Sequence, residues 1–294
     1  MRLPRFDFEA PGSLPMAWEL LDQAQNDARV MAGGTDLLLK MKRGSLAPRI
    51  VISLGRLDSL RRIEPVEHGL RLGSCTPMSR IASHALVLAS FQALAEGAGS
   101  VGGPIIRNRA SVGGNIVNAR PCADTLPPLI ALQATLQLTS KDGQRTLPID
   151  GFVTAPGQCA IRPNEILSAI DLPTPAPNSG SHYIKITRRA AMEVTIVGCA
   201  ASVVLDAAKQ RVVQARLVYT SVAPIPLRIR SAEALIEGEV PTTRLLDAAA
   251  REAQRLAPAI GDHRAPQHYR SELVAVTTRR TLTTAIERAG GRVL

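Results

Sequence analysis

The sequence has few cysteines and no long apolar run, and each scarcity excludes a class of protein. Its four cysteines lie tens of residues apart with no CxxC pair, which leaves a disulfide frame, a zinc site or an iron–sulfur ligand run without local support. We expect isolated reduced thiols. No apolar stretch approaches the roughly 20 residues that a membrane helix needs. Acidic residues and prolines occupy the place of a secretory signal's apolar core, so a cytoplasmic location is expected.

Aromatic residues are also scarce, at 3% of the chain, and this limits how the net charge of +10 is interpreted. Nucleic-acid binding requires clustered cations and, for single strands, aromatic platforms on which bases stack. Here the basic residues occur singly or in pairs such as Arg61-Arg62 and never in a run. The charge therefore favours solubility or docking on acidic protein partners over nucleic-acid binding.

The length of 294 residues predicts about two domains, and the pattern of apolar residues predicts an α+β fold. A helix is expected over residues 13–25, because Ser13 suits an N-cap and Pro15 the first turn. Short strands at 29–32 and 50–52 complete a small α/β unit. Hairpins are expected from 60–65 with 70–73 and from 134–139 with 145–149, with helices at about 78–84 and 88–96 between them.

Alternate prolines at residues 172–180 predict an extended linker and a domain boundary. Beyond it we expect strands at 182–187, 195–205 and 212–220, followed by helices at 241–257 and 269–289. The predicted domains are residues 1–175, with subdomains of about 1–58 and 59–175, and residues 176–294. The second is a smaller C-terminal α+β domain with its strands before its helices.

Residues 97–102 formally satisfy the dinucleotide-binding pattern GxGxxG. That motif functions where a strand leads into the glycines and a helix begins at them. Here the glycines follow an expected helix, so a simple connection is the favoured interpretation.

Two glycine pairs are better placed to bind a phosphate. Gly33-Gly34 follows an expected strand and precedes Thr35-Asp36, so backbone N–H groups could form an anion-binding nest, although any tight turn could use the same residues. Gly113-Gly114 lies among short polar side chains that suit a phosphate and sugar chain. An Asn- and Gly-rich loop satisfying its own backbone explains that segment equally well.

The two loops, in this order and in this context, resemble a known family. The similarity runs nearly end to end, through PRFDFEAPGSL, RVMAGGTDLLLKMKRG, IRNRASVGGNIVNARPCADTLPPLIALQA, PNEILSAIDLP, YIKITRRAAMEVTIVGCAASV, SVAPIPLR and DHRAPQHYRSELVAVTTRRTL. The chain resembles the FAD-binding medium subunit of the xanthine dehydrogenase and carbon monoxide dehydrogenase family, the molybdenum hydroxylases. This implies a PCMH-type FAD-binding domain of two α/β subdomains, followed by the C-terminal domain of the CO dehydrogenase flavoprotein type.

The resemblance also implies a set of cofactor-binding residues. The first loop would cradle the FAD pyrophosphate with backbone amides, and the second would bind pyrophosphate and ribityl oxygens. Asp124 would accept a ribityl or adenosine-side hydroxyl, Leu167 would pack near the isoalloxazine ring, and Lys185 would lie close to the redox-active end of the flavin. The complete implied set is Val30, Met31, Ala32, Gly33, Gly34, Thr35, Asp36, Ala110, Ser111, Gly114, Asn115, Asn118, Asp124, Leu167 and Lys185, with no metal ligand and no catalytic residue.

The implied complex places the organic substrate on another chain. A large molybdopterin subunit would hydroxylate the substrate, a small iron–sulfur subunit would carry electrons, and noncovalent FAD in this chain would pass them to NAD or another acceptor. A dimer of heterotrimers would be the assembly. Some similarity to the 4-hydroxybenzoyl-CoA reductase beta subunit leaves the substrate class open, but the cysteine-rich insert of that branch is absent. A self-sufficient FAD-dependent oxidoreductase and a scaffold with a decayed flavin site remain alternatives.

Overall fold

The computed structural model describes residues 2–294, with only the backbone of Gln25, and its contacts divide the chain into two compact units. Unit 1 comprises the residues up to Arg80, Pro104–Ala119 and Ala134–Pro173. Unit 2 comprises Ile81–Gly103, Arg120–Gln133 and Thr174–Leu294. The chain therefore passes between the units several times before the C-terminal half begins. The expected domain limits at residues 58 and 175 stay predictions.

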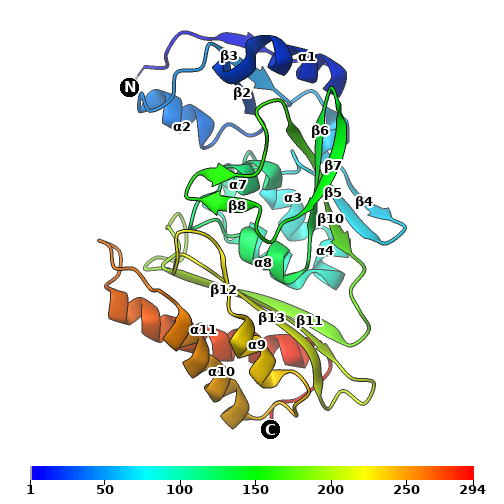
Figure 1. Cartoon of the computed structure of the whole chain (residues 1–294), viewed down its shortest axis with the longest axis vertical. Helices are drawn as coiled ribbons and strands as arrows, with labels where there is room; N and C mark the ends of the chain where they lie inside the picture. The colour runs from blue at the N-terminus through cyan, green and yellow to red at the C-terminus, as the bar shows by residue number, and fades with distance from the viewer. Residues whose placement is uncertain (1) are drawn as a thin grey trace. The chain divides into compact units, whose positions relative to one another are not determined.

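Unit 1 begins with a small parallel sheet that has the strand order β1-β3-β2 (Figure 1). Its strands are β1 (Asp7–Glu9), β2 (Ala28–Met31) and β3 (Ile50–Ser53). Helix α1 (Leu14–Ala24) buries Ala17 and Leu21 against Ile52 and its neighbours in one hydrophobic cluster. The hydroxyl of Ser13 accepts a hydrogen bond from Met16 N at 3.4 Å, as expected of an N-cap. The predicted α/β unit is confirmed, and a short 3-10 turn η1 (Gln25–Asp27) leads into β2.

The rest of unit 1 is built on a five-stranded antiparallel sheet with the order β4-β5-β10-β6-β7. Its members are β4 (Ile63–Val66), β5 (Gly69–Gly73), β6 (Thr135–Ser140), β7 (Gly143–Pro148) and β10 (Ile166–Pro173). Both predicted hairpins are present. The first is shorter than expected because Leu60 belongs to the 3-10 turn η2 (Asp58–Arg61), whose backbone lies so close to Gly73 that a Cβ there would be 2.3 Å from Leu60 O.

Several short elements lie between these strands along the chain. The helices are α2 (Leu37–Lys42), α3 (Met78–Ser83), α4 (Ala85–Ser90), α6 (Pro104–Arg107) and α7 (Val112–Val117), and a two-stranded ribbon joins β8 (Val153–Ala155) to β9 (Gln158–Cys159). The segment 78–99 contains three helices where two were predicted, because the extended backbone of His84 and the non-helical backbone of Phe91 interrupt it.

Unit 2 is an antiparallel sheet covered by helices on both faces (Figure 1). Its strands are β11 (Ser179–Ile186), β12 (Val197–Leu205), β13 (Val212–Thr220) and β14 (Leu227–Arg228). Helices α9 (Arg230–Ile236), α10 (Thr243–Leu256) and α11 (Gln267–Arg288) pack on one face, and α5 (Gln92–Gly99) and α8 (Leu126–Ala131) pack on the other. The predicted order of strands followed by helices is confirmed for the C-terminal part of the chain.

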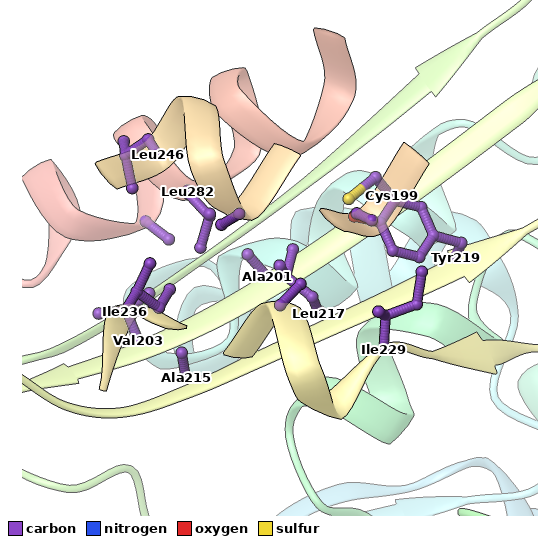
Figure 2. Close-up of a cluster of buried hydrophobic side chains, with 14 of the residues drawn as sticks. Cys199, Ala201, Val203, Ala215, Leu217, Tyr219, Ile229, Ile236, Leu246 and Leu282 are labelled. Carbon is purple, nitrogen blue, oxygen red and sulfur yellow. The ribbon is translucent and has the colours of Figure 1, made fainter. Parts of the chain in front are cut away.

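The alternation along β12 explains why one strand contributes to two buried faces. Cys199, Ala201 and Val203 point into a cluster that includes Tyr219 and Leu282, as Figure 2 shows. Their neighbours Gly198 and Ala200 point the other way. Because both faces are covered, the strand is almost continuously apolar rather than alternating with polar residues.

The proline-rich connection is shorter than the sequence predicted. Strand β10 continues to Pro173, which pairs with Gly69, and β11 starts at Ser179, so only residues 174–178 lie outside regular structure. A proline can end a strand where its missing N–H is not needed by the ladder.

Strand β11 is the edge of the sheet in unit 2, and side chains satisfy its outer backbone groups. Glu96 of α5 accepts from Tyr183 N at 2.8 Å, and Arg288 of α11 donates to Ser181 O at 2.8 Å. The two side chains also pair with each other at 2.7 Å, and the imidazole of His182 lies 2.8 Å from Glu96. This arrangement closes an edge that would otherwise offer unpaired backbone to another strand.

We expect the Glu96→Gln variant to lose stability near neutral pH and much less of it in acid. Burial opposes ionisation of Glu96, but hydrogen bonds from His182, Arg288 and the Tyr183 backbone outweigh it and lower its pKa. A lowered carboxyl pKa stabilises the fold above the unfolded value of about 4.3, and this is lost as pH falls through the lowered pKa. The measurement is the thermal midpoint of both proteins from pH 7 to pH 3. Glu67→Gln, whose side chain is 87% exposed beside His68, is the control that should show no such difference.

Candidate functional site

The two predicted glycine loops lie directly against each other in unit 1. A Cβ built on Gly33 would be 1.7 Å from the carbonyl oxygen of Arg109 and 3.2 Å from the Cα of Ala110. No side chain fits in that space, so glycine is required there for close approach. Gly34 is required for a different reason, because its φ of +75° is in the region that other residues rarely adopt. The pair therefore brings the two loops into backbone contact and then turns the chain.

The first loop connects the end of β2 to α2, as the sequence predicted. Leu38 N donates to Gly34 O at 3.0 Å. This bond links the turn at Gly34 to the first residues of α2, which begins at Leu37. Asp36 occupies the N-cap position, but its side chain makes no capping hydrogen bond. The carboxylate of Asp36 is therefore not committed to capping the helix.

The second loop is fastened to the segment after β5. Met78 N donates to Ala110 O at 2.9 Å, Val112 N to Thr76 O at 3.1 Å and Gly113 N to Ser74 O at 2.8 Å. The hydroxyl of Ser111 accepts from Gly114 N at 3.1 Å and caps α7. These bonds fix the conformation of the loop without any ligand. Some of its polar groups are therefore already used in hydrogen bonds within the protein.

A side-chain hydrogen bond joins the elements that follow the two loops. Lys40 of α2 donates from Nζ to the side-chain oxygen of Asn118 at 2.8 Å. Asn118 follows α7 as its C-cap residue. The predicted residue Asn118 therefore also links the second loop to the first, across 78 residues of sequence.

A pocket opens beside the contact between the loops and contains a residue that the sequence did not indicate. It is lined by Ala32, Gly33, Gly55, Arg61, Cys75, Pro77, Asn108 and Arg109. The Nε of Arg61 is buried there and has no hydrogen-bond partner among the described residues. In the sequence Arg61 was only one member of an ordinary basic pair. Burial raises the pKa of the Cys75 thiol to about 11, so this cysteine is a protonated thiol, as expected of an isolated cysteine.

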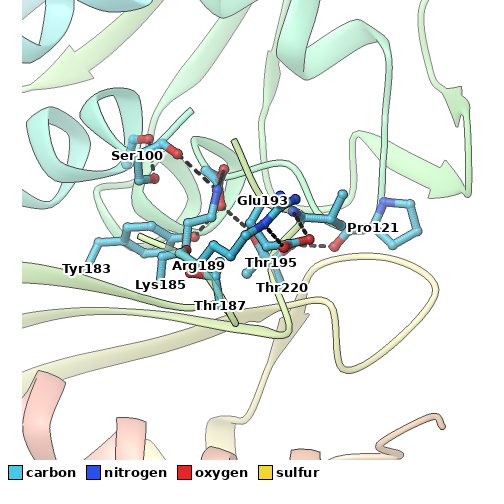
Figure 3. A network of polar contacts seen from close by, with 12 residues as sticks. Ser100, Pro121, Tyr183, Lys185, Thr187, Arg189, Glu193, Thr195 and Thr220 are labelled. Carbon is cyan, nitrogen blue, oxygen red and sulfur yellow. Dashed lines mark hydrogen bonds and ion pairs between the residues drawn. The ribbon is translucent and has the colours of Figure 1, made fainter. Parts of the chain in front are cut away.

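Asp124 and Lys185 belong to unit 2, where they form a buried ion pair within a polar network. Lys185 Nζ donates to Asp124 Oδ2 at 2.7 Å and to Ser100 O at 2.9 Å. The other carboxylate oxygen, Oδ1, accepts from Tyr183 Oη at 2.9 Å and from Thr195 Oγ1 at 2.6 Å. Figure 3 shows the side chains of Tyr183 and Lys185 on β11 close to that of Thr195, which precedes β12. The side chains of Lys185 and Asp124 are 12% and 7% exposed.

The fold explains how these residues meet. Tyr183 and Lys185 are two residues apart on β11 and therefore point to the same face of the sheet. Asp124 lies just before α8, which covers that face, and its backbone carbonyl packs on Gly97, where a Cβ would be 2.7 Å away. Gly97 and Gly99 are in the last turn of α5, so a helix precedes the GxGxxG pattern. The prediction that no strand leads into these glycines is confirmed, and Gly97 serves close packing.

Burial dominates the protonation of this network. It raises the pKa of Asp124, against the opposing effects of Lys185, Thr195 and Tyr183. Burial and the neighbouring carboxylate both raise the pKa of Tyr183 well above its ordinary value, so its hydroxyl stays protonated and donates. Tyr183 and Thr195 thus supply two hydroxyl donors to the pair formed by Asp124 and Lys185.

The remaining predicted residue, Leu167, lies in β10 opposite Leu138 and is 4% exposed. Unit 1 thus holds the whole first loop, the predicted residues of the second loop and Leu167, and unit 2 holds Asp124 and Lys185.

Within residues 2–294, no group of three or more His, Cys, Asp or Glu side chains is placed to hold a metal. No described helix is long and apolar enough to cross a membrane.

Comparisons with known proteins agree with these loops. Residues 4–175 match the model of the FAD binding domain in molybdopterin dehydrogenase, and residues 182–285 match the CO dehydrogenase flavoprotein C-terminal domain. The chain is 33% identical over 269 residues to the xanthine dehydrogenase FAD-binding subunit of Escherichia coli O157:H7, covering 90% of this chain and 91% of the relative. It is 32% identical over 282 residues to the carbon monoxide dehydrogenase medium chain of Hydrogenophaga pseudoflava, covering 96% and 97%.

A solved structure gives the same result for the fold. A chain of carbon monoxide dehydrogenase from Hydrogenophaga pseudoflava matches with a TM-score of 0.93 at 32% identity, covering 98% of this chain and 99% of that one. The α+β fold expected from the sequence is therefore confirmed. The chain belongs to the family of FAD-binding subunits of the molybdopterin dehydrogenases, and it is the FAD-binding subunit of a molybdenum hydroxylase, an oxidoreductase.

Proposed function

We propose that this chain is the electron outlet of its complex, receiving electrons from iron–sulfur clusters in a partner subunit and passing them to NAD or another acceptor. FAD suits this place because it exchanges electrons singly with a cluster and releases them singly or as a hydride. The observation that carries the proposal is the backbone contact of the two glycine loops at Gly33 and Arg109. It forms a narrow cradle in which side-chain-free backbone can approach a diphosphate closely.

The residues of unit 1 would hold the diphosphate part of the cofactor. The first loop, Val30 to Asp36, would contribute backbone N–H groups, and Ala110, Ser111, Gly114, Asn115 and Asn118 of the second loop would contribute backbone and short polar groups. Arg61 adds a cation in the adjoining pocket whose buried Nε has no other partner in the described chain, which favours an anionic occupant. Leu167 would pack near the isoalloxazine ring. All of these contacts are noncovalent.

Lys185 and Asp124 would act on the rest of the cofactor. Lys185 is a nearly buried cation with two of its three N–H groups bound by protein. A fixed cation near a flavin favours the reduced form, which carries more negative charge. Asp124 has both oxygens engaged, but Oδ2 accepts only one bond and retains capacity for a cofactor hydroxyl.

The partners are proposed from the relatives. Their names describe a medium chain of carbon monoxide dehydrogenase and an FAD-binding subunit of xanthine dehydrogenase, which are parts of larger enzymes. We propose a large molybdopterin subunit and a small iron–sulfur subunit, assembled as a dimer of heterotrimers in the cytoplasm. Residues 1–175 would form the FAD-binding domain and residues 176–294 the C-terminal domain.

The test is to purify the full chain without partners and load it with FAD. We expect one flavin per chain, released by denaturation because it is not covalently bound, and no oxidation of xanthine, aldehydes or carbon monoxide. Coexpression with a large molybdopterin subunit and a small iron–sulfur subunit is expected to give a stable complex with substrate-dependent flavin reduction. Turnover of an organic substrate by the chain alone would instead support a self-sufficient oxidoreductase. A chain that folds but binds no FAD would contradict the proposal.

A further inference from the structure

The three donors to Asp124 are distributed unequally over its two oxygens. Tyr183 and Thr195 both donate to Oδ1, and Lys185 alone donates to Oδ2. Rotation of the carboxylate would break the two hydroxyl bonds in a site that is nearly closed to water. Oδ2 is therefore held in one direction, toward the lysine.

The ammonium of Lys185 is in turn held by two acceptors. Asp124 Oδ2 lies at 2.7 Å and Ser100 O, which follows the last turn of α5, lies at 2.9 Å. The third N–H of Lys185 has no acceptor among the described residues. With two bonds fixed and the side chain 12% exposed, that N–H has one direction in which it can point.

Stability alone does not explain this arrangement. A buried ion pair contributes little net stability, because the desolvation of both charges offsets their attraction. Tyr183 on β11 and Thr195, two residues before β12, are both buried, so Phe and Val would fill these positions without the desolvation of a hydroxyl. What the hydroxyls add is control over the charge on the carboxylate, since each donor draws negative charge toward Oδ1 and away from the lysine.

We propose that Tyr183 and Thr195 are positioning residues that act through Asp124 on Lys185 and thereby set the reduction potential of the bound flavin. The inference rests on the proposed function, which places Lys185 near the redox-active end of FAD. Asp124 partly neutralises the lysine, and the two hydroxyls limit that neutralisation. Removing a hydroxyl leaves the carboxylate more negative toward the lysine, so a bound flavin becomes harder to reduce.

The first experiment measures the two-electron midpoint potential of the FAD-loaded full chain in Tyr183→Phe and Thr195→Val, which remove only the donating hydroxyls. We expect each to lower the equilibrium constant for flavin reduction by up to tenfold, or about 30 mV for a two-electron couple. The matched controls are Tyr219→Phe and Thr278→Val, which remove a buried hydroxyl pair at 2.6 Å elsewhere in unit 2. The controls should leave the potential unchanged.

The second experiment is a double-mutant cycle with Asp124→Asn, which leaves Lys185 without its counter-charge and should raise the potential. If Tyr183 acts through Asp124, adding Tyr183→Phe to Asp124→Asn should produce no further shift. Additive shifts would overturn the inference. Should Asp124→Asn fail to fold, the single hydroxyl variants still decide, because a wild-type potential in both contradicts it.

Measuring the FAD content distinguishes a failure of the proposed function from a failure of the inference about Tyr183 and Thr195. A wild-type chain without FAD means that the proposed function has failed. One outcome is that the variants bind FAD with the wild-type potential, and another is that they lose FAD while the loaded fraction keeps that potential. Either result means that the inference alone has failed and that the network is structural.

Discussion

Replacing Gly33 with alanine is expected to abolish tight FAD binding by the purified chain. The added Cβ would be 1.7 Å from Arg109 O, a backbone atom that cannot rotate away. The two loops would have to separate, and forcing extra volume into a packed contact costs about 3 kcal/mol. Since each 1.4 kcal/mol is tenfold in affinity, we expect the dissociation constant for FAD to rise by at least about 100-fold. Titration of the apoprotein with FAD, followed by flavin fluorescence, measures this.

Gly12→Ala is the matched control, because nothing lies within 4 Å of the Cβ that it would add. It should bind FAD as the wild type does. If Gly33→Ala also bound FAD normally and melted at the wild-type temperature, the contact between the loops would be irrelevant to the cofactor. If it lost folding together with binding, Gly114→Ala would separate the effects, since its Cβ meets only the hydroxyl of Ser111, at 2.9 Å.

Replacing Arg270 with methionine is expected to lower the free energy of unfolding of unit 2 by about 3 to 6 kcal/mol, because it removes two buried hydrogen bonds from a charged donor to backbone carbonyls, each contributing about 1.5 to 3 kcal/mol. Arg270 of α11 is 2% exposed. Its guanidinium donates to Asp262 Oδ1 at 2.7 Å and to the carbonyls of Ile196 and Ser221. Ile196 adjoins Thr195, which donates to Asp124, so we also expect weaker retention of FAD. Denaturant unfolding of the full chain measures the stability.

The control for Arg270 is Arg264, because both arginines pair with the same carboxylate. Arg264 lies 3.1 Å from Asp262 Oδ2, and its side chain is 30% exposed against 3% for Arg270. Exposed ion pairs contribute about 0 to 1 kcal/mol, so Arg264→Met should change the stability by less than about 1 kcal/mol. Equal losses in the two variants would show that the stability depends on the charge of Asp262 and not on the buried bonds to backbone.

Local patterns in the sequence predicted the elements that carry the first half of the site. The strand before Gly33 and the turn at the glycine pair depend on residues within a few positions of each other. The helix after Ser111 was not predicted, although its cap from Ser111 to Gly114 is equally local. The predictions that differ from the structure also have local causes. Leu60 forms a 3-10 turn because the backbone of Gly73 packs against it, and the linker is short because Pro173 still pairs with Gly69.

By itself, then, the sequence determined the two predicted hairpins, the strands and long helices of the C-terminal part, the two glycine loops and, through a resemblance that runs nearly end to end, the family. Only the tertiary structure decided which distant residues form hydrogen bonds and ion pairs with one another. Tyr183 and Thr195 are 59 and 71 residues from Asp124, and they meet it because α8, which Asp124 precedes, packs on the face of the sheet to which β11 presents Tyr183. Arg61 likewise reaches the pocket beside Gly33 through folding alone. Hydrogen bonds and ion pairs between such distant residues depend on packing, which has no periodic signature in the sequence.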